Sequence, residues 1–164
     1  MSTVYIACSM IRSVGIDFSL LDILEEWIIN QQLLPFTPGK MEDTSPDVIF
    51  KRDMKMLEKS DFIIADVNEP SHGVGMEIMY AYEHGMPVIC VLNKENRPFS
   101  RMVDGSPHVY LIEYENKENL KTKLERIKLK DLLIEFCETC QNRTIHYEKV
   151  CKRCKNKGNS PKAI

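Results

Sequence analysis

One acidic residue, Glu77, occurs where a ligand-binding loop is expected. It follows the run Pro70-Ser71-His72-Gly73-Val74-Gly75-Met76, which links an apolar strand predicted over 61–67 to the first turn of a helix. Open α/β sheets bind ligands at the carboxyl ends of their strands. Gly73 and Gly75 allow close approach to the backbone, and a helix N-terminus favours anions. Taken alone, Gly-x-Gly without a third glycine is a weak phosphate-loop motif, and a Glu in a first helical turn usually only compensates the helix dipole.

A second carboxylate, Asp53, belongs to a different predicted helix. It lies four residues after Ile49 and four before Leu57, so it shares the apolar face that is expected to pack on the sheet. A carboxylate buried there is costly unless it is hydrogen-bonded, so Asp53 is either paired structurally or functional. Asp53 and Glu77 together could form the carboxylate pair that glycosidic-bond chemistry commonly uses.

Four cysteines near the C-terminus form two Cys-x-x-Cys pairs. Cys137 and Cys140 make the first, Cys151 and Cys154 the second, and ten residues separate the pairs. This spacing is typical of a four-thiolate zinc site, and the alternative is a set of redox or incidental cysteines. Because both pairs are complete, no coordination position stays open for catalysis. We therefore expect one structural Zn²⁺ per chain and no organic cofactor.

The charge is divided unevenly along the 164 residues. Residues 1–136 carry 15 Lys/Arg and 22 Asp/Glu, a balance of −7, whereas residues 137–164 carry 7 and 2, a balance of +5. The split suggests two modules with different partners, and the basic tail could contact nucleic acid or protein or simply be solvated. No run approaches the length of about 20 apolar residues that a membrane span needs. We expect a cytoplasmic protein with no membrane partner.

Short apolar segments alternate with helical ones along most of the chain. Strands are predicted over 3–8, 61–67, 87–92 and 109–112, with a short edge strand over 33–37 that contains Pro35. Helices are predicted after Asp17 and Ser45, before Gly85, and over 118–136. This alternation predicts an α/β fold, a mostly parallel sheet with helices on both faces. We place a first domain at 1–134 and a small zinc-binding module at 135–164.

Four segments in register resemble the nucleoside 2-deoxyribosyltransferase superfamily, and within it most closely the 2′-deoxynucleoside 5′-phosphate N-hydrolases. The segments are Tyr5-Ile6-Ala7-Cys8-Ser9, Ile49-Phe50-Lys51-Arg52-Asp53, Ser60-Asp61-Phe62-Ile63-Ile64-Ala65 and Pro70-Ser71-His72-Gly73-Val74-Gly75-Met76-Glu77. The resemblance covers residues 3 to about 115, and the fourth segment is its most specific part. It implies a flavodoxin-like fold and a homodimer.

The resemblance also implies roles for individual residues. Glu77 matches the nucleophile that attacks C1′ of the sugar, Asp53 the acidic residue that helps the base depart, and Tyr5 the tyrosine beside the nucleophile. Six residues before Glu77, where transferases carry an aspartate that grips the sugar, stands Ser71, as in the nucleotide hydrolases, where a serine contacts the 5′-phosphate. A hydroxyl in place of a carboxylate removes charge repulsion against phosphate. Ser100 matches a serine that reaches this phosphate from the neighbouring subunit.

The first loop departs from the family pattern. Cys8 stands where a glycine is usual, and Arg12 is displaced by one position, so phosphate contacts are expected from Ser9 and Arg12 in a modified loop. The implied function is hydrolysis of the N-glycosidic bond of (deoxy)nucleoside 5′-monophosphates to free base and (deoxy)ribose 5-phosphate through a covalent glycosyl-Glu77 intermediate. Two alternatives remain. The first is a deoxyribosyltransferase acting on nucleosides, and the second is a nucleotide-sensing or nucleic-acid-binding adaptor without turnover.

Overall fold

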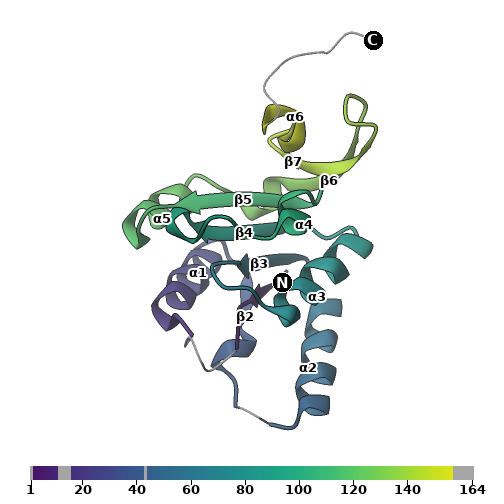
Figure 1. The fold of residues 1–164 in the computed structure, drawn as a ribbon. Coiled ribbons are helices and arrows are strands. Elements are labelled where there is room, and N and C mark those ends of the chain that lie inside the picture. The colour runs from purple at the N-terminus through teal and green to yellow at the C-terminus, as the bar shows by residue number, and fades with distance from the viewer. Residues whose placement is uncertain (1, 11–15, 43, 157–164) are drawn as a thin grey trace.

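The computed structural model describes residues 2–10, 16–42 and 44–156, and this part of the chain contains two sheets (Figure 1). The strands are β1 (Thr3–Ala7), β2 (Leu34–Phe36), β3 (Phe62–Asp66), β4 (Val88–Asn93), β5 (Val109–Tyr114), β6 (Leu132–Cys137), β7 (Asn142–Tyr147) and β8 (Val150–Cys151). The α-helices are α1 (Phe18–Asn30), α2 (Pro46–Glu58), α3 (His72–Glu83), α4 (Arg101–Asp104), α5 (Lys117–Leu124) and α6 (Lys152–Asn156). None of the helices in this part is long and apolar enough to cross a membrane.

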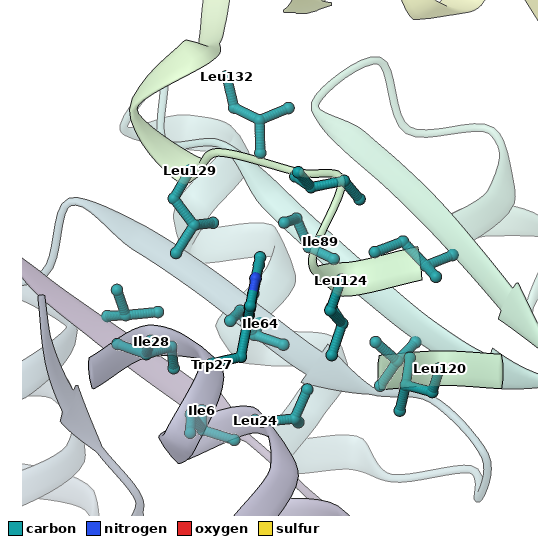
Figure 2. Packing of buried hydrophobic residues seen from close by; sticks show 14 of the residues in the cluster. Ile6, Leu24, Trp27, Ile28, Ile64, Ile89, Leu120, Leu124, Leu129 and Leu132 are labelled. Carbon is teal, nitrogen blue, oxygen red and sulfur yellow. The ribbon is translucent and has the colours of Figure 1, made fainter. Parts of the chain in front are cut away.

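The larger sheet is parallel throughout and has the strand order β2-β1-β3-β4-β5. Helices α1 and α5 pack on one face, and α2 and α3 pack on the other (Figure 1). The α/β flavodoxin-like prediction is therefore confirmed, including the edge position of the proline-containing strand β2. On the α1 and α5 face, Leu24, Trp27, Ile64, Ile89 and Leu120 form one continuous apolar core (Figure 2).

Alternation along β1 decides which side chains reach the second face. Val4 and Ile6 belong to the core beneath α1 and α5, whereas Tyr5 and Ala7 belong to the core beneath α2 and α3. Successive side chains of a strand point to opposite faces. Tyr5 therefore lies on the face that α2 and α3 cover, and these are the two helices that carry Asp53 and Glu77.

The C-terminal sheet is antiparallel and has the order β6-β7-β8. It packs on the larger sheet, because Leu132, Ile145 and Tyr147 join the same core as Ile89, and the Ile145 N–H donates to the Pro107 carbonyl at 2.8 Å. The three-stranded sheet begins at Leu132, and the division of the chain at 134/135 stays a prediction.

The helix predicted over 118–136 is confirmed up to Leu124, where α5 ends, and is wrong beyond it. A 3₁₀ turn occupies Leu129–Asp131, and the chain from Leu132 onward forms β6. Ile127 and Leu129 are buried in the turn region, where the Leu129 N–H donates to Gln31 Oε1 at 2.7 Å. The chain leaves the helix because these long-range contacts, together with pairing to β7, outweigh the local helical pattern.

Candidate active site

The centre of the site is a hydrogen bond between Tyr5 and Glu77. The Tyr5 hydroxyl of β1 donates to Glu77 Oε1 of α3 at 2.6 Å. The tyrosine is fully buried, and the centre of its ring lies 5.7 Å from the centre of the Phe36 ring. Burial and the neighbouring Glu77 carboxylate raise the pKa of the Tyr5 hydroxyl, so the hydroxyl stays protonated and serves as a fixed donor.

Burial also changes the ionisation of Glu77. It raises the pKa of this carboxyl to about 7; the hydrogen bond from Tyr5 opposes the rise, and the negative charge of Asp53 adds to it. A carboxyl with a pKa near 7 is half ionised at neutral pH and can act as a nucleophile, an acid or a base there. The structure joins Tyr5 to Glu77 by a hydrogen bond, and Asp53 lies near enough for its charge to raise the pKa of both groups.

Asp53 is held by its neighbour on α2. Arg52 Nε donates to Asp53 Oδ1 at 2.7 Å, and the two side chains are 20 % and 14 % exposed. The second guanidinium nitrogen, Arg52 Nη2, is buried without a hydrogen-bond partner among the described residues. A buried donor without a partner is costly, so Arg52 Nη2 is expected to be satisfied by a bound water, an ion or a catalytic partner. The sequence reasoning missed Arg52, although it stands in the Arg-Asp pair of the second family segment.

The loop from β3 to α3 is fixed by the amide of Asn68. Its Nδ2 donates to Asp66 Oδ1 at 2.7 Å and to the Tyr114 hydroxyl at 2.9 Å, and its Oδ1 accepts from the Asn93 N–H at 2.6 Å. One side chain thus joins the carboxyl ends of β3, β4 and β5. Asn68 lies inside the segment that the sequence singled out, but no local pattern revealed its long-range partners.

Two of the predicted phosphate-contacting residues lie around one cavity. Ser71 caps α3, accepting from the Val74 N–H at 3.3 Å, and lines a cavity of about 410 Å³ together with Gly75 and Ser100. An added Cβ at Gly75 would meet nothing within 4 Å, so this glycine leaves open space next to the helix N-terminus. Gly73 is exposed beside it. Ser71 and Ser100 reach this cavity from the same chain.

Ser9 lies at a second, smaller cavity. That cavity, of about 260 Å³, is lined by Cys8 and Ser9 from the end of β1 and by Asp66, and it shares Asn68 and Asn96 with the larger cavity. The two cavities are therefore neighbours at the carboxyl edge of the sheet. Arg12, the other predicted phosphate ligand, lies outside the described residues.

The chain is similar to known proteins in sequence and in fold. The family model described as nucleoside 2-deoxyribosyltransferase matches residues 20–125. The chain belongs to this family. A Methanosarcina mazei protein named for 2′-deoxynucleoside 5′-phosphate N-hydrolase activity is 38 % identical over 122 residues, which cover 70 % of this chain and 69 % of that protein. The 5-hydroxymethyl-dUMP N-hydrolase of Rattus norvegicus is 29 % identical over 85 residues, covering 51 % of each chain.

The fold is shared with solved structures. A CMP N-glycosidase of Clostridium botulinum superimposes with a TM-score of 0.62 over 77 % of this chain and 100 % of that one, at 20 % sequence identity. Similarity at this level of identity concerns the fold alone. The part of this chain that superimposes includes a parallel sheet of order β2-β1-β3-β4-β5.

The departure of the first loop from the nucleoside 2-deoxyribosyltransferase pattern has a structural counterpart. Cys8 packs against the 3₁₀ turn Pro38–Lys40, and an added Cβ on Gly39 would lie 2.6 Å from Cys8 Sγ. The cysteine thus occupies space that a side chain at Gly39 would need. Burial, with the charges of Asp66 and Glu77, raises the pKa of the Cys8 thiol to about 11, so the thiol stays protonated near the site.

The four C-terminal cysteines come together as a candidate metal site. Cys137 ends β6, Cys140 lies in the following turn, Cys151 ends β8 and Cys154 lies on α6. All four Sγ atoms lie within 4.8 Å of one another, with 3.6 Å between Cys137 and Cys154 and 3.9 Å between Cys140 and Cys151. A tetrahedral Zn²⁺ with Zn–S bonds of about 2.3 Å separates its sulfurs by about 3.8 Å. The sulfurs of Cys140 and Cys154 are closer, at 3.1 Å. The four thiols lie close enough together to hold a metal ion.

Proposed function

We propose that the protein hydrolyses the N-glycosidic bond of (deoxy)nucleoside 5′-monophosphates, releasing the free base and (deoxy)ribose 5-phosphate. The observation that carries the proposal is the Tyr5–Glu77 hydrogen bond, with the charge of Asp53 acting on both groups. Ser71, which caps the helix that carries Glu77, lines a cavity of about 410 Å³. The names of the N-hydrolase relatives from Methanosarcina mazei and Rattus norvegicus support this reaction class.

In the first step the ionised Glu77 carboxylate attacks C1′ of the sugar. The C1′–N bond breaks, its electron pair leaves with the base, and a glycosyl ester forms on Glu77. The Tyr5 hydroxyl fixes the attacking carboxylate through its 2.6 Å hydrogen bond. In this proposal Asp53, held by Arg52, hydrogen-bonds to the departing base or protonates it. Water then attacks C1′, which releases the sugar phosphate and regenerates the glutamate.

The substrate phosphate binds at the start of α3 in this proposal. The Ser71 hydroxyl and the exposed Gly73 N–H can donate at this helix N-terminus, whereas the Gly75 N–H already donates to the Ser71 carbonyl at 3.1 Å and Gly75 only leaves open space. A hydroxyl at position 71 avoids the repulsion that a carboxylate there would exert on the phosphate. Ser9, Arg12 and Ser100 are the further proposed phosphate contacts. Transfer to a second base is distinguished from hydrolysis by adding a free base to the reaction.

We also propose a homodimer that forms through the outer face of α3. Met76, Met79 and Tyr82 of this helix and Met102 of α4 are exposed and line an apolar cavity of about 690 Å³ that reaches Ser100. Exposed apolar patches of this kind mark contact surfaces. The proposal predicts a dimeric mass in light scattering that Met79→Lys lowers to that of a monomer; a monomeric mass for the unmodified chain contradicts it.

The bound metal is proposed to be one structural Zn²⁺, held by Cys137, Cys140, Cys151 and Cys154, which ties β6, β8 and α6 together. With four thiolates the ion has no open position, so it supplies folding energy and not chemistry. We place the enzyme in the cytoplasm, where a reducing environment keeps such thiolates available. Metal analysis of the purified chain should give one zinc per chain.

The reaction is tested by incubating the chain with a panel of ribo- and deoxynucleoside monophosphates and the matching nucleosides, and quantifying the released base by chromatography. We expect release from monophosphates only and loss of release in Glu77→Ala, with an unchanged circular dichroism spectrum. Release from free nucleosides at equal rates would contradict the phosphate site. Retained turnover in Glu77→Ala would contradict the nucleophile.

A further inference from the structure

A separate cavity lies where the C-terminal sheet meets the edge of the larger sheet. It has a volume of about 480 Å³ and is bounded by the edge strand β5, the end of α5, and the β7–α6 region. It shares no lining residue with the two cavities at the carboxyl edge of the sheet. None of the residues assigned above to catalysis, to the substrate phosphate or to zinc lines it.

The walls of this cavity concentrate positive charge within an acidic part of the chain. Four cationic side chains line it, from Lys94, Lys123, Arg126 and Lys152, against two carboxylates, Glu113 and Glu148. Three of these cations and one of the carboxylates belong to residues 1–136, whose net charge is −7, so the sign of the charge is locally reversed there. Cations that converge on one cavity favour an anionic ligand.

The existing ion pairs leave part of this positive charge unbalanced. Glu113 is paired with Arg97 at 2.5 Å, outside the cavity wall, and Lys123 Nζ donates to the backbone carbonyl of Glu113 at 2.5 Å, which is a neutral acceptor. Lys94 is paired with Glu115 at 2.6 Å. The exposed Arg126 is bonded through its backbone: its N–H donates to the Lys123 carbonyl at 3.3 Å, and its carbonyl accepts from the Tyr147 hydroxyl at 2.8 Å. Its guanidinium can therefore turn toward a ligand.

The aromatic part of the cavity is already occupied from within the chain. Lys152 Nζ lies 4.9 Å from the centre of the Tyr110 ring and 4.8 Å from that of Tyr147. Cation–π contacts of this kind fix the position of an ammonium group. Because Lys152 covers both rings, they are poorly placed to stack on a base. The cavity is better suited to recognise the charge of a ligand.

We propose that this cavity binds a phosphorylated small molecule, with Arg126, Lys123 and Lys152 contacting its phosphate oxygens. Guanidinium and ammonium groups are the side chains that recognise phosphate through charge-assisted hydrogen bonds. The ligand is either a nucleoside polyphosphate or inorganic pyrophosphate, because both present the same oxyanions. The site exists only where the C-terminal module meets the larger sheet, so it gives that module a role beyond stabilising the fold.

The test is isothermal titration calorimetry on the full zinc-loaded chain with pyrophosphate and, separately, with dATP. Arg126→Glu is the decisive variant, since the Arg126 side chain is exposed and lines the cavity. Lys121→Glu is the matched control: it makes the same charge change five residues earlier, on α5, at an exposed position outside the cavity. Circular dichroism confirms that each variant is folded.

Removing one charge-assisted contact and adding a repulsive charge should weaken binding about tenfold or more in Arg126→Glu, and less than about twofold in Lys121→Glu. Binding of dATP but not pyrophosphate identifies a nucleotide as the ligand, and equal affinities identify the phosphate groups alone. The proposal is overturned if neither probe binds, if both variants weaken binding equally, or if Arg126→Glu leaves the affinity unchanged. Binding seen only with a single-stranded oligonucleotide would also overturn it, in favour of a nucleic-acid surface.

Discussion

The hydrogen bond from Tyr5 to Glu77 allows a quantitative prediction about the pH dependence of the reaction. The nucleophile must be ionised, so kcat/KM for the free enzyme should rise with pH and level off above the Glu77 pKa of about 7. Tyr5→Phe removes a donor that stabilises the ionised form. The carboxyl of the variant should therefore hold its proton to higher pH, and the rising limb of the pH profile should shift to higher pH.

The size of this effect follows from the charge of the acceptor. A hydrogen bond to a charged group contributes about 1.5–3 kcal/mol, and one pH unit corresponds to 1.36 kcal/mol, so the limb should move by about 1 to 2 pH units. Since Glu77 is half ionised near pH 7, the variant should be about five- to fiftyfold slower there and should recover most of its rate at high pH.

The assay is base release at sub-saturating substrate between pH 5 and about 9.5, a range that brackets the limbs expected for both proteins. The substrate phosphate also titrates, with a second pKa near 6, but this ionisation is the same for both proteins and cannot produce a difference between them. A limb that stays in place while the rate falls equally at every pH would refute the reasoning. Tyr5 would then contact the substrate instead of tuning the carboxyl of Glu77.

Three further predictions concern other parts of the molecule. Arg52→Ala should lower kcat/KM about ten- to hundredfold because Asp53 loses its ion-pair partner, and Arg52→Lys should restore part of the rate. Equal losses in the two variants would show that Arg52 does not act through its charge. Gly39→Ala should lower the free energy of unfolding by about 1–3 kcal/mol in urea denaturation, because the added Cβ meets Cys8 Sγ. Adding Cys8→Ala should recover most of this loss, and an unchanged loss in the double variant would mean that the clash lies elsewhere. Cys154→Ser or chelation should abolish zinc binding and lower the melting temperature in differential scanning calorimetry, with the base-release rate of the folded fraction unchanged; a melting temperature insensitive to chelation would contradict a structural ion.

The parts of the fold that the sequence predicts are those governed by local patterning. The buried strand around Ile63 and Ile64, the Asp17 cap of α1, and the proline-containing edge strand β2 each have a short-range signal, and each is present. The side chain of Asp17 accepts from the Leu20 N–H at 3.1 Å, as a helix cap does. The five-stranded parallel sheet follows from the regular alternation of such elements.

The parts that could not be predicted depend on contacts between distant residues. Leu129 and Leu132 read as the continuation of a helix, but the first is fixed by Gln31, 98 positions earlier, and the second pairs with Tyr147. The role of Asn68 in joining three strands likewise requires partners up to 46 positions away.

The candidate site divides in the same way. Asp53 was distinguished by its spacing on an apolar helix face, whereas Tyr5 would be an ordinary strand aromatic without the family resemblance. The packing of Cys8 on Gly39 joins two loops that have no shared motif, so only the folded chain reveals it.

The most direct test of the central claim is to trap the glycosyl–enzyme ester. A deoxynucleoside monophosphate carrying fluorine at the 2′ position slows loss of the sugar from the ester, and intact-protein mass spectrometry after an acid quench detects the adduct. The account predicts a mass increase of one fluorinated sugar phosphate per chain, mapped to the peptide that contains Glu77 and absent from Glu77→Gln. An adduct on another residue, or base release by the unmodified chain with no adduct at any time, would contradict it.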